Sequence, residues 1–589
     1  MADTQPPVKY SKGEFLVDVH DAKMMKKLVK AGWIYDGESK LWFTADVRIA
    51  AGMAVFAEGK ALKKINKYRS IRKKALAPSL KSHSDFSVPA PEGESYMPFQ
   101  LAGIEYASTR KRTLIGDPPG LGKTIQAVGF GNLKTAKSIL IICPASLKDN
   151  WTKEWKKWDL HNRTISQPRK KVRTKTENYK IVKRWTEDEW LDTDVHVINY
   201  EMVAKFKETH PPEGFDLVII DEAHYLKNED AQRTIAVFGH QGRWANRPNH
   251  KKHIPVTDPI KAEWMIALTG TPLESRPKDL WVLCKNFDPD GLGKNKIAFE
   301  KRYCNAWAAP WGWDNSGESN LHELQERLRL SFMVRRNKEE VLPDLPPKRR
   351  QIIEIPADTA TKRLIKAEID GVRNLLALYE TDLDDHEQVL SLVSDKKKFH
   401  FLDGSNLDEQ AKKLTTDRQY AFQEIAEIRK ELAIAKAPIV NEFVSNLMDA
   451  EEKVLLFCYH KDVAAHFKES YPDCGFITGM TPTKKRQPEV DRFQDDPKCN
   501  PFIGGITAAG VGYTLTASDK PVFAEITWVP SQLEQAEDRA WRIGQVNSVL
   551  AYYLLFAGSL ETQMMNTCVR KMGIVNQALD ATQDFLDLA

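Results

Sequence analysis

The sequence predicts an α/β protein with two lobes built on parallel sheets, a helical insertion between the lobes and a small basic module at the N-terminus. Two stretches, 95–290 and 454–555, alternate short runs of Val, Ile and Leu with amphipathic segments, a texture typical of parallel strands joined by crossover helices. Residues 359–436 between them are charged and helical in pattern. A chain of 589 residues also exceeds what one hydrophobic core can organise. We therefore expect four parts, at residues 1–90, 91–290, 291–435 and 436–589.

The first part of the chain is markedly basic. Residues 1–90 hold 17 Lys and Arg against 9 Asp and Glu, and residues 60–81 contain nine basic side chains and no acidic one. Five of these lysines fall on one face of an expected helix: Lys60, Lys63, Lys64, Lys67 and Lys74. A solvated helix face is one interpretation, but a run of one sign repels itself unless a counter-charge is present. Phosphate is the obvious counter-charge, so we expect Lys63, Lys64 and Lys67 to contact nucleic acid.

A loop rich in Gly and Pro follows the expected strand Thr113–Ile115 and leads into a helix that opens at Lys123 and Thr124. Such a loop presents successive backbone N–H groups to phosphate, and the helix N-terminus adds partial positive charge. Lys123 would reach the β- and γ-phosphates of ATP, and the Thr124 hydroxyl would bind Mg²⁺. The remaining residues expected to bind the nucleotide are Asp117, Pro118, Pro119, Gly120, Leu121 and Gly122.

Asp117 departs from the general phosphate-loop pattern. The spacing GxxxxGK[ST] requires glycine at this position. A tight turn between strand and helix, with an incidental lysine, is therefore a competing interpretation of the loop taken alone.

A pair of carboxylates follows the apolar run Leu217–Ile220, which has the pattern of a buried central strand. Ligands of open α/β sheets bind at the carboxyl ends of the strands, and Asp221 and Glu222 stand at that end. Adjacent carboxylates repel each other unless a cation lies between them. We expect Asp221 to hold Mg²⁺ and Glu222 to orient and polarise the attacking water.

The second lobe contains two arginines in the segment Gln535–Gln545, which has the pattern of a helix ending near Gly544. Arg539 and Arg542 are three residues apart and would share one face of that helix. A salt-bridged surface helix is one interpretation, because acidic residues are close by. With a phosphate loop and an acidic pair in the other lobe, the pair is better explained as arginine fingers that stabilise charge on the transferred phosphoryl group.

Composition argues against several classes of protein. No stretch approaches 18 uninterrupted apolar residues, and the N-terminal MADTQPPVKY lacks the apolar core of a signal peptide. The seven cysteines are scattered without a CxxC pair, a pattern of reduced thiols with no zinc site. We expect a cytoplasmic protein, or a nuclear one in a eukaryote, that is neither secreted nor in a membrane. Residues 168–175 (PRKKVRTK) fit either a nuclear-localisation signal or a basic surface insertion.

Taken in order, the segments of the first lobe resemble the motifs of the Swi/Snf-type branch of superfamily 2 helicase-like ATPases. The resemblance spans roughly residues 97–570 and implies two RecA-like lobes. Residues 98–104 (PFQLAGI) are similar to an adenine-sensing motif, which places Gln100 on the base. Residues 117–124 match the family's DxxGxGKT, so the departure at Asp117 is a family trait, although Pro118-Pro119 replaces its usual acidic and apolar pair.

Other segments of both lobes are similar to motifs that face DNA or couple it to hydrolysis. The resemblance implies that Lys148, Asn199 and Tyr200 of the first lobe and Thr514 of the second bind DNA. Residues 268–272 (LTGTP) resemble the coupling motif. Residues 535–545 (QAEDRAWRIGQ) are close to the family's QAEDRxHRIGQ, which adds Gln535 to the catalytic residues, with Trp541 where His is common.

The HepA-related (HARP) annealing-helicase subgroup is the closest likeness. Residues 428–438 before the second lobe resemble that subgroup, although the run is short enough to be any charged helix. At the N-terminus Phe15–Val17, Gly32-Trp33 and Trp42–Thr44 resemble a small HARP-type β module. An unrelated basic domain with an aromatic core is the alternative.

The resemblance implies an ATP- and Mg²⁺-dependent translocase that acts as a monomer on double-stranded or forked DNA, with fork remodelling or strand annealing as its expected role. A strand-separating helicase and an ATP-gated DNA clamp, or docking platform, are the alternatives. Protein partners cannot be read from the sequence.

Overall fold

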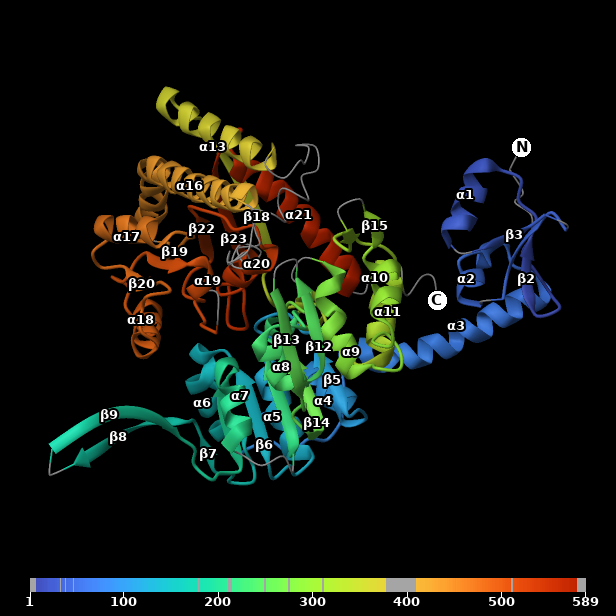
Figure 1. Cartoon of the computed structure of the whole chain (residues 1–589), viewed down its shortest axis with the longest axis horizontal. Helices are drawn as coiled ribbons and strands as arrows, with labels where there is room; N and C mark the ends of the chain where they lie inside the picture. The colour runs from blue at the N-terminus through green and yellow to red at the C-terminus, as the bar shows by residue number, and fades with distance from the viewer. Residues whose placement is uncertain are drawn as a thin grey trace. The chain divides into compact units, whose positions relative to one another are not determined.

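The computed structural model (Figure 1) describes residues 7–579 apart from 32, 38, 46, 178–179, 210–213, 248–249, 274–275, 310–311, 378–408, 451 and 510–511. The chain divides into two units, the first ending at Lys81 and the second beginning at Ser82. Each unit has its own hydrophobic core.

The first unit is a four-stranded antiparallel sheet in the order β1-β2-β4-β3, with helices beside it. Phe15, Trp33 and Trp42 are buried in its core together with Ala61 and Ile65 of the last helix, so the aromatic residues of this module are core residues. The elements are β1 (Lys9–Ser11), β2 (Glu14–Val17), α1 (Ala22–Ala31), β3 (Ile34–Asp36), β4 (Leu41–Thr44), α2 (Val47–Ala51), η1 (Ala54–Phe56) and α3 (Gly59–Leu80).

Helix α3 carries the predicted basic run. Lys63, Lys64 and Lys67 are exposed, while Ala61 and Ile65 turn inward, which is the amphipathic division expected of a helix lying on a core. The Nζ of Lys64 lies 4.2 Å from the centre of the Tyr10 ring. The helix therefore presents its lysines to solvent.

The second unit contains two parallel sheets, which form the two predicted lobes. The sheet of lobe 1 has seven strands in the order β17-β5-β14-β11-β6-β10-β7. They are β5 (Arg112–Ile115), β6 (Ile139–Cys143), β7 (Ile165–Ser166), β10 (Val195–Asn199), β11 (Phe215–Asp221), β14 (Ala262–Leu268) and β17 (Met333–Val334).

Both faces of this sheet are covered, as the unbroken apolar runs require. Leu217 and Ile219 point into one core cluster, and Val218 and Ile220 point into the other. The first cluster lies under helices α4 (Pro98–Ser108), α5 (Lys123–Leu133) and α6 (Lys148–Trp158). The second lies under α7 (Val203–Thr209), α8 (Gln232–Phe238), α9 (Trp281–Phe287), α10 (Lys296–Tyr303) and α11 (Leu321–Ser331).

Two antiparallel hairpins are inserted into lobe 1 (Figure 1). The first pairs β8 (Arg169–Glu177) with β9 (Lys180–Glu189), so most of the basic run 168–175 is a strand of this hairpin. The second pairs β12 (His240–Arg247) with β13 (His250–Thr257). A third, short hairpin of β15 (Trp307–Ala309) and β16 (Gly312–Asp314) precedes α11.

The sheet of lobe 2 has six strands in the order β18-β23-β22-β19-β21-β20, and every pairing is parallel. The strands are β18 (Lys348–Ile355), β19 (Val454–Cys458), β20 (Gly475–Ile477), β21 (Phe502–Gly505), β22 (Lys520–Phe523) and β23 (Val549–Phe556). The helices are α13 (Thr359–Ala377), α16 (Glu409–Asp449), α17 (Lys461–Ser470), α18 (Thr483–Asp495), α19 (Ile506–Ala509), α20 (Pro530–Glu537) and α21 (Leu560–Leu579).

The stretch 291–435, expected to be the helical insertion, also supplies one strand to each sheet. β17 pairs with β5 in lobe 1, and β18 pairs with β23 in lobe 2. The sequence did not predict either strand. β17 is buried but only two residues long, and β18 (KRRQIIEI) is an edge strand whose charged side chains are mostly exposed. Short helix α12 (Lys338–Val341) connects them. Residues 378–408 of the expected insertion lie outside the described part of the chain.

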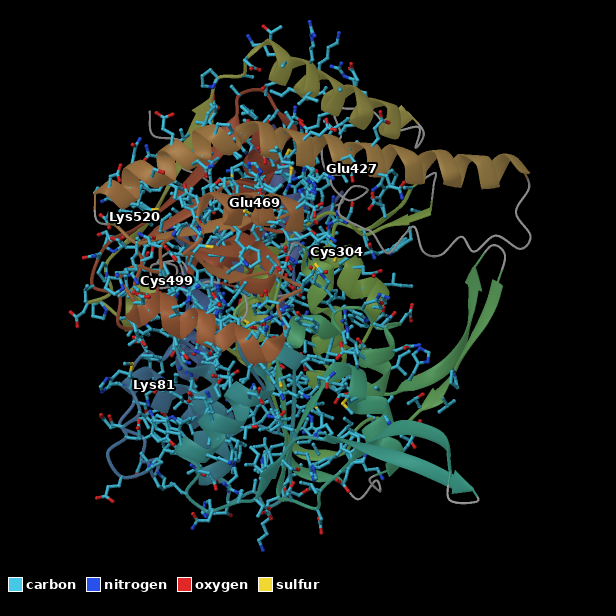
Figure 2. The ribbon with its side chains drawn as sticks, turned by 90° about the vertical axis from the view of Figure 1, so that its left-hand side faces the viewer. Lys81, Cys304, Glu427, Glu469, Cys499 and Lys520 are labelled. Carbon is cyan, nitrogen blue, oxygen red and sulfur yellow. The ribbon has the colours of Figure 1, made fainter. Side chains whose placement is uncertain are left out.

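The cysteines and helices complete the description. All seven cysteines are buried and free; Cys304 and Cys499, labelled in Figure 2, belong to the cores of lobe 1 and lobe 2 respectively. Among the described residues, no helix combines the length and the apolar character needed to cross a membrane.

Candidate active site

The predicted ATP-binding residues gather at one edge of the lobe 1 sheet. Strands β5, β14 and β11 are adjacent and parallel, so the loops that follow them leave from the same edge. These loops are the phosphate loop, the LTGTP segment and the Asp221-Glu222 pair. The topology therefore brings together three motifs that are far apart in the sequence.

The phosphate loop has the backbone of an anion cradle. Gly120 and Gly122 have φ of +92° and +72°, a region that favours glycine. A Cβ at Gly122 would lie 2.5 Å from Nε2 of Gln100, which donates a hydrogen bond to the Leu121 carbonyl at 3.3 Å. The other end of that amide, Oε1, accepts from the Met97 N–H at 3.0 Å. Gln100 therefore ties the start of α4 to the loop, and its expected contact with adenine stays a prediction.

Lys123 lies at the start of α5, inside the loop. Its Nζ donates to the carbonyls of Asp117 at 2.8 Å and Pro118 at 3.4 Å. Burial lowers the pKa of Lys123, and the nearby carboxylates of Glu222 and Asp117 oppose that effect. A buried ammonium held by the loop's own carbonyls is positioned to turn toward a more strongly charged acceptor such as phosphate.

Asp117 is completely buried beneath the loop and forms an ion pair with Arg336. Oδ1 accepts from the Arg336 backbone N–H at 3.1 Å and from its Nε at 3.0 Å, and Gln126 donates to Oδ2 at 3.0 Å. Burial alone would raise the pKa of Asp117, but the Arg336 guanidinium outweighs it and lowers the pKa. Asp117, the residue that departs from the general phosphate-loop pattern, is thus the buried residue through which Arg336 anchors the loop.

Sequence reasoning did not find Arg336 or its neighbour Arg335. Arg336 also donates to the Phe99 carbonyl at 2.6 Å, and Arg335 donates to the carbonyls of Gly116 at 2.5 Å and Gly270 at 3.0 Å. Both follow directly after β17, at the same sheet edge as the phosphate loop. The sequence signal that could have pointed to them is a pair of arginines directly after a short apolar run (FMV), the position at which a strand ends.

Pro119 explains part of the loop's unusual composition. A Cβ at Gly270 in the LTGTP segment would lie only 2.7 Å from Cδ of Pro119. The proline ring therefore packs directly on the backbone of that segment. The loop and the segment expected to couple hydrolysis to DNA are in van der Waals contact.

The acidic pair ends β11. Glu222 has φ +52° and ψ 52°, a left-handed conformation that is uncommon for a residue with a side chain and frequent at functional sites. Burial and the charge of Glu222 raise the pKa of Asp221 to about 7, against a hydrogen bond from Trp151 Nε1 at 2.7 Å. Burial would raise the pKa of Glu222, but the interactions with His224 and Lys123 outweigh this effect and lower the pKa of Glu222 to about 2.

These residues fit ATP with Mg²⁺. Burial and the neighbouring Glu222 disfavour the charged form of Asp221. A cation beside this carboxylate would stabilise that form. Its oxygens and the Thr124 hydroxyl are donors that Mg²⁺ prefers, and Mg²⁺ bound with phosphates needs few protein ligands. The left-handed glycines leave room for phosphate, and Lys123 supplies a cation.

A chain of contacts runs from the acidic pair to lobe 2. His224 Nδ1 lies 2.9 Å from Thr269 Oγ1, which accepts from the Thr271 N–H at 3.1 Å. Thr271 Oγ1 accepts from Nε2 of Gln535 in α20 at 3.2 Å. Gln535 is therefore in direct contact with lobe 1 at the site.

The two arginines lie at the same place, but not on a helix. Helix α20 ends at Glu537, and beyond it the Arg539 carbonyl accepts from the Leu515 N–H at 3.0 Å and not from a helical N–H. The expected helix from Gln535 to Gly544 is wrong beyond Glu537, where the chain turns.

Those turns fix both guanidiniums. Arg539 donates to the carbonyls of Gln535 and Tyr513, each at 3.1 Å, and Arg542 donates to the Asp538 carbonyl at 3.0 Å and to Thr514 Oγ1 at 3.2 Å. A Cβ at Gly120 would lie 3.0 Å from Cγ of Arg542, so this side chain packs on the phosphate loop. Burial, and then the charge of Arg542, lower the pKa of Arg539. Two neighbouring cations, Arg539 buried and Arg542 half-buried beside the phosphate loop, favour an anion between them.

The Trp541 side chain packs against residues that link the two lobes. It thereby attaches the segment that carries Arg539 and Arg542 to this linker. The Nζ of Lys338 and of Lys348 lie 4.4 and 4.9 Å from its ring centre, and its Nε1 donates to the Pro346 carbonyl at 2.7 Å. Lys338 also donates to the Trp541 carbonyl at 2.7 Å and pairs with Asp538 at 3.0 Å. Only Asn337 separates Lys338, anchored in lobe 2, from Arg336, anchored beneath the phosphate loop.

The residues expected to face DNA differ in exposure. Thr514 is exposed, and Lys148 and Asn199 are half-buried. Tyr200 is 2% exposed and donates its hydroxyl to the Asp221 carbonyl at 2.6 Å, so it supports the end of β11, and its expected contact with DNA stays a prediction. Lys63, Lys64 and Lys67 belong to the other unit.

The segments that carry these residues meet across the lobes. A Cβ at Gly512 in lobe 2 would collide with Cδ2 of Leu147, which precedes Lys148 in lobe 1. The expected DNA-facing motifs of the two lobes are therefore side by side.

Two parallel-sheet lobes, a phosphate loop, an acidic pair and an arginine pair facing that loop define a two-lobed, helicase-like ATPase. Comparison with known families is specific. The model of the SNF2-related domain matches residues 99–245 and 246–414, and the helicase conserved C-terminal domain matches residues 435–544. The chain belongs to the SNF2-related family, which confirms the predicted Swi/Snf-type membership.

Its relatives agree with the expected HepA-related subgroup. The chain is 31% identical over 507 residues to the DNA annealing helicase and endonuclease ZRANB3 of Bos taurus, covering 83% of this chain and 41% of that protein. It is 29% identical over 493 residues to the SWI/SNF-related matrix-associated actin-dependent regulator of chromatin subfamily A-like protein 1 of Xenopus tropicalis, covering 82% and 45%. The chain thus spans less than half the length of these relatives.

A solved structure is also similar. The Sulfolobus solfataricus SWI2/SNF2 ATPase core in complex with dsDNA matches 85% of this chain and 100% of that one, at 20% identity and a TM-score of 0.35.

Proposed function

We propose that this chain is an ATP- and Mg²⁺-dependent motor that translocates on double-stranded DNA and acts on forks or anneals strands. The observation that carries the proposal is the composite site. Gln535 contacts Thr271 across the lobes, and Arg542 packs on Gly120 of the phosphate loop. A site shared by two lobes can close on ATP and open after hydrolysis, which is the cycle that a translocating motor needs.

The geometry supports a role for each residue. Lys123 and the loop would hold the phosphates, Thr124 and Asp221 would hold Mg²⁺, and Glu222 would orient the attacking water. Arg539 and Arg542 would stabilise charge on the transferred phosphoryl group.

The DNA substrate is supported by the contact between the expected DNA-facing segments and by the exposed lysines of α3. The relatives named as annealing helicases support action on forks or complementary strands. Such a motor grips phosphates more than bases, so we expect no sequence preference.

The test is steady-state ATPase activity without nucleic acid and with single strands, duplex, forked DNA and RNA. Stimulation by duplex or forked DNA above RNA supports the proposal, and equal rates with all of them reject it. Displacement of a third strand from a triplex without separation of the duplex would distinguish translocation from helicase activity. A slow ATPase that binds DNA without displacing a third strand would indicate a clamp.

Glu222→Gln is the matched variant for these assays. The substitution keeps the shape and hydrogen bonding of the side chain but removes the carboxylate that polarises water. We expect no measurable turnover while ATP and DNA binding remain. Hydrolysis at the parental rate would contradict the role of Glu222.

A further inference from the structure

A cavity of about 260 Å³ adjoins Glu222 and is lined by both lobes. This volume is far above the ~10–15 Å³ that admits one water molecule. The residues that give the cavity its chemistry are Glu222, Tyr225, Lys227 and Arg233 from lobe 1 and Thr507 and Gln532 from lobe 2. Glu222 and Arg233 are half-buried and Lys227 is exposed, so the lining runs from the catalytic carboxylate toward solvent.

Two polar atoms among these residues are buried without a hydrogen bond. Within the described part of the chain, neither Nε of Arg233 nor Oε2 of Glu222 has a hydrogen-bond partner, although Oε2 lies 3.3 Å from His224 Nδ1. Leaving a buried polar atom unpaired costs roughly 1–3 kcal/mol. The Arg233 Nε–H is a donor that an anion in the cavity would satisfy, and the Glu222 oxygen is an acceptor that the attacking water would satisfy.

Arg233 is held in place by a stack of aromatic rings. Its guanidinium lies 5.3 Å from the centre of the Tyr225 ring, which stacks on Tyr200 at 5.5 Å with an interplanar angle of 10°. Tyr200 in turn donates to the Asp221 carbonyl. The unpaired Nε–H of Arg233 lies on a guanidinium that lines the cavity, and phosphate is the anion that suits a guanidinium fork.

We propose that this cavity is the exit path and a transient binding site for the inorganic phosphate released by hydrolysis. The inference rests on the proposed ATPase function. ADP stays on the phosphate loop, whereas the cleaved phosphoryl group leaves on the side of the attacking water, where Glu222 stands. The Glu222 carboxylate repels the departing anion, and Arg233 and then Lys227 attract it toward solvent.

A backbone phosphate of DNA has the same chemistry, so the experiment separates the two sources. The variants are Arg233→Gln, Lys227→Gln and both together, with Arg233→Lys as the conservative partner. Lys294→Gln, an exposed lysine of lobe 1 outside the cavity lining, is the control. Matching thermal unfolding of parent and variants shows that the fold is retained.

In single turnovers, acid quench measures hydrolysis and a fluorescent phosphate sensor measures release. We expect each glutamine variant to hydrolyse at the parental rate and to release phosphate about tenfold more slowly, from the loss of one charged contact. Arg233→Lys should recover part of the release rate. Release in step with hydrolysis in the double variant overturns the proposal. So does a loss of DNA affinity with unchanged release, because the phosphate bound there would then be that of DNA.

A binding measurement keeps this inference separate from the motor function. Inorganic phosphate is titrated calorimetrically into parent protein that holds ADP and Mg²⁺, and into Arg233→Gln. Weaker binding by Arg233→Gln supports the cavity as a phosphate site, and equal binding overturns it. A parent that binds phosphate in this way but shows no DNA-stimulated hydrolysis would reject the motor function alone.

Discussion

Replacing Arg336 with glutamine removes the guanidinium that neutralises Asp117 beneath the phosphate loop. The two side chains are 1% and 0% exposed, so water cannot solvate the carboxylate that is left. Of the contacts described for Asp117, two neutral hydrogen bonds would remain, from the backbone N–H of residue 336 at 3.1 Å and from Gln126 at 3.0 Å. Breaking one side of a buried ion pair costs roughly 3–5 kcal/mol. We expect a loss of that size in the free energy of unfolding of lobe 1, together with weaker nucleotide binding.

Arg163→Gln is the matched control. Arg163 and Asp159 form another buried ion pair of lobe 1, each side chain being 5% exposed, and Arg163 also donates to the Ala136 carbonyl at 2.6 Å. Both variants should lower the urea midpoint followed by tryptophan fluorescence. Only Arg336→Gln should weaken the binding of a fluorescent ATP analogue in titrations of the folded protein.

A second variant covers the case in which Arg336→Gln does not fold. Asp117→Asn combined with Arg336→Gln removes both charges, so part of the lost stability should return. Nucleotide affinity within twofold of the parent in Arg336→Gln would refute the reasoning. So would a double variant less stable than the single one.

Three further outcomes follow from the structure. Arg542→Ala should slow hydrolysis by about 10³-fold with ATP affinity retained, as seen in single-turnover rates, and near-parental rates would reject its finger role. Changing Lys63, Lys64 and Lys67 to glutamine should weaken DNA binding and reduce the slope of log K against log salt by about 3, and an unchanged slope would place DNA elsewhere. Burial would raise the pKa of Glu537, but Lys348 and Arg350 outweigh it and hold the pKa at about 2. Its folded pKa therefore lies below the unfolded value of about 4.3, so its contribution of about 3 kcal/mol is present above that pH and lost as the pH falls toward 2. Urea unfolding at pH 5 and pH 3 should show a smaller pH dependence in Glu537→Gln than in the parent.

The parts of the site that could be predicted are those in which local sequence dictates local geometry. A strand, a glycine-containing turn and a helix containing Lys123 form one continuous segment, and the same holds for the apolar strand that ends at Asp221. Sheet topology then places these segments together, because parallel strands share their carboxyl edge.

The parts that could not be predicted depend on contacts between distant segments. Arg336 meets Asp117 from 219 residues away, and the two-residue strand that delivers it carries no periodic pattern. Beyond the end of α20 the chain is held by a hydrogen bond from Leu515 to the Arg539 carbonyl, a distant contact that no helix propensity encodes. The burial of Tyr200 likewise follows from tertiary packing, which the sequence of its motif does not encode.

The single-residue connection at Asn337 has a practical consequence for labelling or re-engineering this protein. Neighbouring Cα atoms are about 3.8 Å apart, so the chain has almost no slack between the anchor under the nucleotide and the anchor beside the arginines. An inserted reporter or spacer at this point would lengthen the connection between the two anchors, so a movement of one lobe would no longer pull directly on the other. The same insertion at the tip of a surface hairpin would leave both anchors in place. Inserting one glycine at Asn337 therefore tests whether a movement of one lobe reaches the other through this stretch of backbone.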